Sequence, residues 1–379
     1  MKKIFDIKNY EKKIDIFYMK KAIALAKKGQ HTTNSNPNVG CIIVKNKKII
    51  GIGWHIKPNT NHAEINALNM AGNLAYQGTA YISLEPCSHF GKTPPCCNAL
   101  IQSGISRVVI SVLDPNPNIS GNGIKYLRRS GIKVTTGILL KQSQQINCGF
   151  FKRMTIGLPW IQLKMATSMD GKTAMHNGES QWITSKKSIK DVHNFRSLSS
   201  AILSTSQTVI TDNALLTVRL EKYNIKYHNQ PIRIIIDSKN KIKPHHKLIK
   251  KLGRIWLIRL KKDTNFWPNY VKQIIIPSYK NKINLIKLFY FLGKKEINKI
   301  WIECGSTLFS QLLNLNIVDE LFLYIAPKML GHTSKSLYIM NKKIKLNEAL
   351  KLKFKYIKFI GSDLRIILTP LIKNKYIKK

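Results

Sequence analysis

No apolar run in the sequence approaches the roughly 20 residues that a helix needs to cross a bilayer, so no association with a membrane is expected. Acidic residues are few, with 19 Asp and Glu beside 63 Lys and Arg. Residues 1–13 are charged and polar with no apolar segment behind them, which argues against a secretory signal. Internal repeats and Gly/Ser-rich or Pro-rich linkers are absent. What is present suits a globular protein: 379 residues, of which 44% are apolar and spread along the whole chain, suffice for two or three domains.

Cysteine is also scarce, with six in the chain. Three of the six, Cys87, Cys96 and Cys97, lie within eleven positions of one another. This crowding suits metal binding in a reducing compartment better than a disulfide framework. We therefore expect a cytoplasmic protein.

The formal net charge of +44 allows two interpretations. One is a nucleic-acid partner. The other is compositional drift, because Lys, Asn and Ile are enriched together in every part of the chain. A nucleic-acid footprint should cluster its cations or interleave them with aromatic residues, and the nearest patch, residues 373–379, is short. We favour drift and expect no nucleic-acid partner, although the charge should still steer small phosphorylated substrates.

Alternating helix and strand patterns indicate an α/β fold in both halves. In the first half we expect helices at 18–28, 62–71 (with Asn61 as N-cap) and 96–102, and strands at 39–44, 48–52, 80–84 and 107–112. The pattern loosens at 148–159, which suggests a domain boundary. In the second half we expect strands at 160–166, 231–237, 255–259, 299–303 and 320–325, and helices at 186–198 and 307–315.

One histidine, one glutamate and two cysteines form the most informative pattern. His62-Ala-Glu64 is followed by Pro86-Cys87, and Cys96 lies nine residues further on. A catalytic zinc site uses three protein ligands and one water, and His62, Cys87 and Cys96 supply imidazole and thiolates. Glu64 suits the general acid/base that passes protons to the departing ammonia. H-x-E alone is common, but together with both cysteines it indicates a zinc deaminase.

Several alternatives accompany this interpretation. A structural zinc site would normally have four ligands and no use for Glu64. His89 is either a fourth ligand or part of the pocket wall, and we favour the wall. Cys97 is expected to pack in the core, because neighbouring residues of a helix seldom point at one metal. Both ligand cysteines are expected where helices begin, since a helix N-terminus stabilises a thiolate.

The segment Pro86–Cys96 resembles the deaminase domain of the bifunctional riboflavin biosynthesis proteins. The motifs Asn36–Gly40, His62–Glu64 and Asp114–Pro117 support the resemblance. It implies a cytidine-deaminase-like α/β/α sandwich with one Zn²⁺ per chain, and it places Asn36 and Lys92 in the substrate pocket. Nucleic-acid editing deaminases instead carry P-C-x-x-C, whereas eight residues separate the cysteines here.

The second half is less specific when considered on its residues alone. No G-x-G-x-x-G follows any predicted strand, so a Rossmann dinucleotide site is not expected. The segment Trp301–Leu308 predicts a strand that passes through Gly305 into a helix. Backbone N–H groups at such a helix start can bind a pyrophosphate, but a simple strand-to-helix turn fits equally well.

Four further segments resemble the reductase domain of the same family: Gln162–Lys172, Gly178–Thr184, Pro231–Ser238 and Ala326–Gly331. The resemblance runs from about Ile14 to the C-terminus. It implies a deaminase domain at 14–155 and a dihydrofolate-reductase-like α/β domain at 156–379 that uses NADPH. The residues implied to contact NADPH are Ala166, Trp182, Thr208, Asp212, Ser238, Gly305, Ser306, Thr307, Leu308, Phe309, Ser310 and Gln311. Those implied to contact the ribosyl-phosphate substrate are Ser180, Arg196, Leu216, Arg219 and Glu303.

Two positions depart from the family pattern. Asp212-Asn213-Ala214 stands where the family usually has Asp-Asp-Pro or Asp-Pro, which predicts a softer loop. Cys304 replaces a small residue before Gly305, which predicts slight crowding of the cofactor. Lys164 and Glu303 are the polar groups expected nearest the reacting carbonyl.

The resemblance implies two consecutive steps of riboflavin biosynthesis. The first is hydrolytic deamination of 2,5-diamino-6-(5-phosphoribosylamino)pyrimidin-4-one, and the second is NADPH-dependent reduction of the ribosyl group of the resulting uracil. It also implies a homo-oligomer. Two rivals stay open at this point: a tRNA-editing deaminase with a non-catalytic C-terminal module, and an active deaminase joined to an inactive second half.

Overall fold

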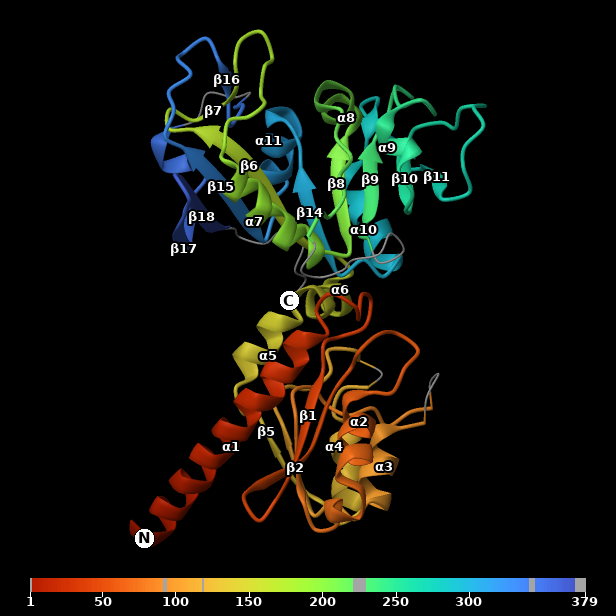
Figure 1. Ribbon diagram of the computed structural model, residues 1–379, viewed down its shortest axis with the longest axis vertical. Coiled ribbons are helices and arrows are strands. Elements are labelled where there is room, and N and C mark those ends of the chain that lie inside the picture. The colour runs from red at the N-terminus through yellow and green to blue at the C-terminus, as the bar shows by residue number, and fades with distance from the viewer. Residues whose placement is uncertain (1, 91–93, 118, 221–229, 341–344, 372–379) are drawn as a thin grey trace. The chain divides into compact units, whose positions relative to one another are not determined.

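The structure, a computed structural model, describes residues 2–90, 94–117, 119–220, 230–340 and 345–371, with side chains from residue 9 onward. The chain divides into two compact units, Met1–Thr155 and Ile156–Lys379 (Figure 1). None of the described helices combines the length and the apolar character that a membrane span requires. Lys92 and the basic segment 373–379, both singled out from the sequence, lie outside the described residues.

The first unit is built on a five-stranded sheet with the order β2-β1-β3-β4-β5. Strand β1 is antiparallel to both of its neighbours, whereas β3, β4 and β5 run parallel. Because parallel strands end at one edge of a sheet, the loops that follow them meet there. The strands are β1 (Gly40–Lys45), β2 (Lys48–Trp54), β3 (Thr79–Ile82), β4 (Arg107–Ile110) and β5 (Lys133–Thr136).

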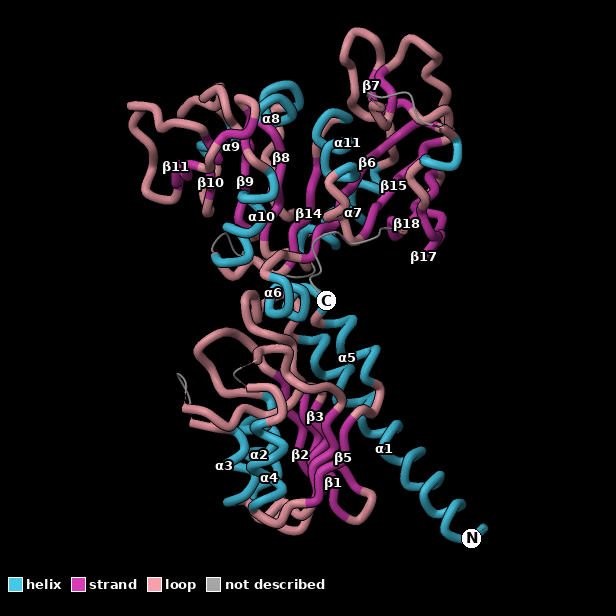
Figure 2. Tube along the Cα trace, turned by 180° about the vertical axis from the view of Figure 1, so that it is seen from behind, coloured by secondary structure: helices cyan, strands magenta, loops and turns pink. Residues whose placement is uncertain are grey.

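Helices cover both faces of this sheet, as Figures 1 and 2 show. On one face, apolar residues of α1, and residues just before and at the end of α5, pack against Ile42, Tyr81 and Val109. On the other face, α2, α3 and α4 enclose a second cluster that contains Ile43 and Val108. The expected α/β/α sandwich is therefore confirmed. The helices are α1 (Lys2–Lys28), α2 (Ala63–Ala71), η1 (Gly72–Ala75), α3 (Cys96–Gln102), α4 (Asn122–Arg129), α5 (Leu140–Ile146) and α6 (Cys148–Ile156).

Three sequence expectations need correction in this unit. Helix α1 begins at Lys2 and not at Tyr18: residues 9–13 are helical although they are exposed, so the buried apolar spacing that predicted the helix marks only its second half. The N-cap of α2 is His62 and not Asn61, and it makes no side-chain capping hydrogen bond. The segment 148–159, where the sequence pattern loosens, is mostly helical, because it contains α6 with Gly149 buried. Its irregular backbone is confined to the residues around Gly157.

Close packing of β2 against α2 ties the sheet to the helix that carries Glu64. A Cβ atom on Gly53 would lie 2.1 Å from the Ala63 carbonyl oxygen and 2.6 Å from the Ala67 nitrogen. Both atoms are backbone and cannot rotate away. We expect Gly53→Ala to destabilise this unit by up to about 3 kcal/mol, the upper range for overpacking, and to weaken metal binding by displacing α2. Thermal unfolding and metal titration measure both effects, and unchanged values would contradict the packing described here.

The second unit contains a nine-stranded sheet with the order β11-β10-β9-β8-β14-β6-β15-β18-β17. All strands from β11 to β15 in this order are parallel, and β18 and β17 complete the sheet as antiparallel strands. The strands are β6 (Trp160–Ser168), β8 (Ala201–Thr205), β9 (Ile232–Ile236), β10 (Ile255–Arg259), β11 (Val271–Ile275), β14 (Lys299–Glu303), β15 (Glu320–Ala326), β17 (Leu352–Ile360) and β18 (Asp363–Pro370). Two small ribbons pair β7 (Lys172–Ala174) with β16 (Lys335–Ser336) and β12 (Ser278–Tyr279) with β13 (Lys282–Ile283).

Two apolar clusters, one on each face, hold helices against this sheet. The first includes Val192, Val209 and Leu248 from α7, α8 and α9. The second includes Phe289 of α10 and Phe309 of α11. This layered α/β architecture agrees with the expected fold class. The helices are α7 (Lys186–Ser197), α8 (Ser206–Asp212), α9 (Lys247–Lys250), α10 (Leu285–Lys294), α11 (Ser306–Asn314) and η4 (Leu346–Glu348).

Candidate active sites

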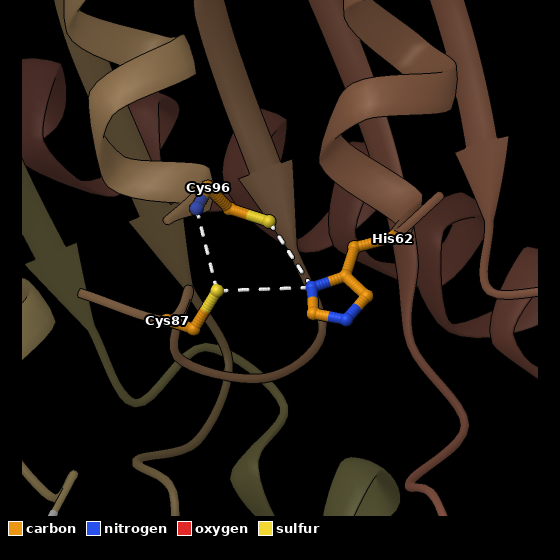
Figure 3. A group of neighbouring side chains, drawn as sticks. All are labelled: His62, Cys87 and Cys96. Atoms are coloured by element: carbon orange, nitrogen blue, oxygen red, sulfur yellow. Dashed lines mark hydrogen bonds between the residues drawn. The ribbon is translucent and has the colours of Figure 1, made fainter. Parts of the chain in front are cut away.

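Two helix starts and one loop of the first unit bring His62, Cys87 and Cys96 together (Figure 3). His62 is the N-cap of α2, and Cys96 is the first residue of α3. The His62 Nδ1 atom lies 3.2 Å from Cys96 Sγ and 3.7 Å from Cys87 Sγ. Cys87 lies in the loop between β3 and α3, so the expectation that both cysteines begin helices holds only for Cys96.

The three side chains fit a zinc ion. Their ligand atoms all lie within 4.8 Å of one another, and tetrahedral Zn–N and Zn–S bonds place ligand atoms about 3.5–3.8 Å apart. Interaction with the Cys96 thiol, together with hydrogen bonding to His62, lowers the pKa of Cys87, which favours the thiolate. Cys97 instead directs its sulfur toward the carbonyl oxygens of Pro86 and Gly123, at 3.5 and 3.8 Å, as expected of a packing residue.

Glu64 lies beside this group in the first turn of α2 and is only 3% exposed. Burial, together with the nearby Cys87 charge, raises the pKa of its carboxyl group to about 7. A carboxyl group with such a pKa can both accept and release a proton near neutral pH. The position of Glu64 thus suits the proton-transfer role predicted from the sequence.

Two residues of this site were missed from the sequence. His55 follows β2 and is buried, its ring centroid lies 5.4 Å from that of His62, and its Nε2 atom is 3.1 Å from Asn36 Nδ2. Burial lowers the pKa of His55 and favours its neutral form. The available signal was a histidine three residues after the predicted strand 48–52 and seven residues before His62.

The second missed residue, Glu85, fixes the loop that carries Cys87. Its carboxylate accepts hydrogen bonds from the backbone N–H groups of Asp114, Gly121 and Gly123, at 3.0–3.1 Å. The loop after β3 is thereby joined to the loop that leads into α4. A glutamate beside Pro86-Cys87 gave no signal of this role, because its partners lie 29 or more residues away.

In the second unit, Lys164 on β6 and Glu303 on β14 are paired in register, as expected. The guanidinium of Arg196 binds both oxygens of Glu303, with Nε–Oε1 at 2.6 Å and Nη2–Oε2 at 2.9 Å. Burial alone would raise the pKa of Glu303, but Arg196 and Lys164 hold it at about 2. Burial lowers the pKa of Lys164, although the negative charge of Glu303 partly raises it again. A charged, largely buried cluster therefore lies where β14 ends, beside the middle of β6.

The structure separates the two arginines that were expected to contact phosphate. Arg196 is largely buried and ion-paired with Glu303. Arg219 is exposed, and no carboxylate of a described residue forms an ion pair with it. Of the two arginines, Arg219 is thus the one whose side chain is open to solvent.

The residues expected to contact NADPH, together with Ser180 and Leu216 expected to contact the substrate, are spread over several elements of the second unit. Ser180 Oγ donates to Asp212 Oδ1 at 3.3 Å, and burial raises the pKa of Asp212. Trp182 is 64% exposed. The remaining expected residues lie in β6 (Ala166), in the first turn of α8 (Thr208), after β9 (Ser238) and in the loop after α8 (Leu216).

Gly305 is the N-cap of α11 and is exposed, and a Cβ atom added to it would meet nothing within 4 Å. The first N–H groups of a helix have no partner within it, so this surface can receive an anion. Leu308, Phe309 and Ser310 bury their side chains, and the backbone N–H of Phe309 donates to the carbonyl oxygen of Gly305, so their side chains do not reach this surface. The side chain of Cys304 packs into the core. It therefore points away from this surface, in contrast to the crowding that was predicted.

The first unit has the fold and the ligand arrangement of the cytidine-deaminase-like zinc enzymes, and a second α/β domain follows it. Two family models match: "Cytidine and deoxycytidylate deaminase zinc-binding region" at residues 12–112 and "RibD C-terminal domain" at residues 159–366. Riboflavin biosynthesis protein RibD of Buchnera aphidicola subsp. Baizongia pistaciae is 55% identical over 365 residues, which are 94% of this chain and 98% of that protein. The chain belongs to the RibD family of riboflavin biosynthesis proteins.

Two other proteins define the extent of the similarity. The solved structure of Acinetobacter baumannii RibD, form 2, has a TM-score of 0.87 at 35% identity and covers 95% of this chain and 99% of that one. A diaminohydroxyphosphoribosylamino-pyrimidine deaminase of Buchnera aphidicola subsp. Acyrthosiphon pisum is 68% identical over 145 residues, which are 38% of this chain but 99% of that protein. As a family member, this chain is an enzyme that joins a zinc-binding deaminase domain to a reductase domain that uses an NADPH-type cofactor.

Proposed function

We propose that this chain catalyses two consecutive steps of riboflavin biosynthesis. The first is hydrolysis of the 2-amino group of 2,5-diamino-6-(5-phosphoribosylamino)pyrimidin-4-one, which releases ammonia. In the second, a hydride from NADPH reduces the ribosyl group of the resulting uracil to a ribityl chain. The convergence of His62, Cys87 and Cys96 beside the buried Glu64 carries the proposal, in a chain of the RibD family. Product analysis with and without NADPH tests it.

For the deaminase step, His62, Cys87 and Cys96 would hold one zinc ion per chain. Zinc in such a site lowers the pKa of a bound water to about 7 and so supplies hydroxide at neutral pH. Glu64 takes the proton of that water and passes it to the ring nitrogen and the departing amine. His55 and Asn36, which interact with each other at 3.1 Å, form the polar wall of the same pocket.

The change Glu64→Gln tests the proton-transfer role. The amide keeps the shape of the side chain and a hydrogen-bonding oxygen, but it cannot accept a proton. We expect zinc binding to persist and deamination to fall by about 10²–10⁴, the usual contribution of a general acid/base. Metal analysis and steady-state kinetics measure the two quantities. Loss of the metal together with activity would identify Glu64 as a ligand and contradict the assignment.

For the reductase step, the pyrophosphate of NADPH would bind at the Gly305 surface, where the helix dipole favours an anion. NADPH supplies the hydride. Arg196 fixes the orientation of Glu303 through two hydrogen bonds, and Lys164 and Glu303 lie nearest the reacting carbonyl as a source and acceptor of protons. Arg219 binds the substrate phosphate, because a guanidinium can hold phosphate oxygens through two parallel hydrogen bonds.

The nucleic-acid alternative is not favoured. Nucleic-acid editing deaminases carry P-C-x-x-C, and this spacing differs from that of Cys87 and Cys96. A non-catalytic second half would also leave the match to a RibD-type C-terminal domain unexplained. We further propose that the protein works in the cytoplasm as a homo-oligomer on small phosphorylated pyrimidines, with no nucleic-acid or membrane partner.

A further inference from the structure

His193 lies on α7, one helical turn before Arg196, and is 4% exposed. Its Nδ1 atom accepts a hydrogen bond from the backbone N–H of Arg219 at 3.2 Å. Arg196 Nη1 donates to the carbonyl oxygen of Thr217 at 2.9 Å. Positions three apart share one face of a helix, so α7 holds the segment from Thr217 to Arg219 at two backbone atoms.

The hydrogen bond to Nδ1 determines the state of the imidazole. A backbone N–H can only donate, so Nδ1 must carry the lone pair and the proton of the neutral ring is on Nε2. Burial and the charges of Arg196 and Arg219 lower the pKa of His193 to about 4, which keeps the ring neutral. The Nε2 atom lies 3.4 Å from Arg219 Nη2. Since both atoms carry protons, this contact does not engage the guanidinium, which stays available to a ligand.

Helix α7 is itself firmly attached to the sheet. Asp363 of β18 accepts hydrogen bonds from the backbone N–H of Ser185 at 2.7 Å and from the hydroxyl of Ser188 at 2.6 Å. Asp191 accepts from the hydroxyl of Tyr324 at 2.7 Å. His193 therefore extends from an anchored helix, which is what a side chain that positions another residue requires.

We propose that His193 is a positioning residue of the reductase site, which fixes the backbone of Arg219 so that its guanidinium meets the phosphate of the ribosyl substrate. This inference rests on the proposed function, in which Arg219 binds that phosphate. His193 itself touches neither substrate nor cofactor.

Two replacements of similar size separate the hydrogen bond from packing. His193→Leu removes the acceptor, whereas His193→Asn places an amide oxygen near the position of Nδ1. Reduction is measured with the phosphorylated uracil and with the same riboside lacking phosphate. We expect His193→Leu to raise KM for the phosphorylated substrate about tenfold, the effect of one lost hydrogen bond, with kcat and the KM of the dephosphorylated riboside little changed. His193→Asn should restore KM to within about threefold of the original.

Arg219→Ala provides the coupling test. If His193 acts through Arg219, His193→Leu should have no further effect on KM in the Arg219→Ala background. Equal effects of His193→Leu on both substrates, or additive effects with Arg219→Ala, would overturn the positioning role. If Arg219→Ala itself leaves the preference for the phosphate unchanged, the proposed function of Arg219 fails instead. Reduction of the dephosphorylated riboside, which also depends on the second unit, reports whether that unit has folded in each variant.

Discussion

The Cys87→Ala protein is expected to bind no zinc and to show no measurable deamination, while it still reduces the deaminated uracil at a near-normal rate. Cys87 supplies one of three ligands, and the pair left behind offers too few groups for a catalytic zinc site. None of the residues assigned to reduction lies in Met1–Thr155. Metal analysis, ammonia release and NADPH oxidation measure the three quantities on one preparation.

Cys97→Ala is the matched control, because Cys97 is the adjacent cysteine but directs its sulfur away from the metal ligands. It should keep both zinc and deamination. An active, zinc-replete Cys87→Ala protein would refute the ligand assignment. Loss of reduction in the same variant would refute the independence of the two sites.

Gly305→Asp should produce the converse result, with reduction abolished and deamination normal. A Cβ atom added there meets nothing within 4 Å, and aspartate is favourable at an N-cap, so the domain should fold. Its carboxylate would occupy the helix N-terminus and repel the pyrophosphate. Unit charges about 4 Å apart near a protein surface interact by about 4 kcal/mol, which corresponds to roughly a thousandfold loss of NADPH affinity. Fluorescence titration of NADPH and accumulation of the uracil measure the effect.

Gly305→Ala separates volume from charge. It adds only a methyl group in the same open space, so it should weaken NADPH binding far less than the aspartate does. Equal losses in both variants would mean that close backbone approach, and not repulsion, governs this surface. Normal NADPH binding by Gly305→Asp would exclude the start of α11 as the cofactor site.

The helices and strands whose formation depends on residues close together in the sequence could be predicted from that sequence. Alternating patterns located β1, β2 and β6 to within about two residues, because strand periodicity is local. The helix start at Cys96 was visible for the same reason. In contrast, α4 and β5 escaped notice because α4 is mostly polar and β5 is short.

Pairings over long sequence separations could not be predicted. Arg196 and Glu303 are 107 residues apart and meet only when β14 lies between β6 and β8. Their ion pair distinguishes Arg196 from Arg219, two residues that looked equivalent in the sequence. His55 and Glu85 escaped for a related reason, since their roles depend on which loops converge at the edge of the sheet.

The most direct test of the central claim is incubation of the purified full-length protein with the diaminopyrimidine phosphate, followed by mass analysis of the products. Without NADPH, we expect one amino group to be replaced by oxygen, with one equivalent of ammonia released. With NADPH, the same product should gain two hydrogen atoms as one NADPH is oxidised. A substrate returned unchanged under both conditions would contradict the proposed function, and a product that stops at the uracil with NADPH present would contradict its second step.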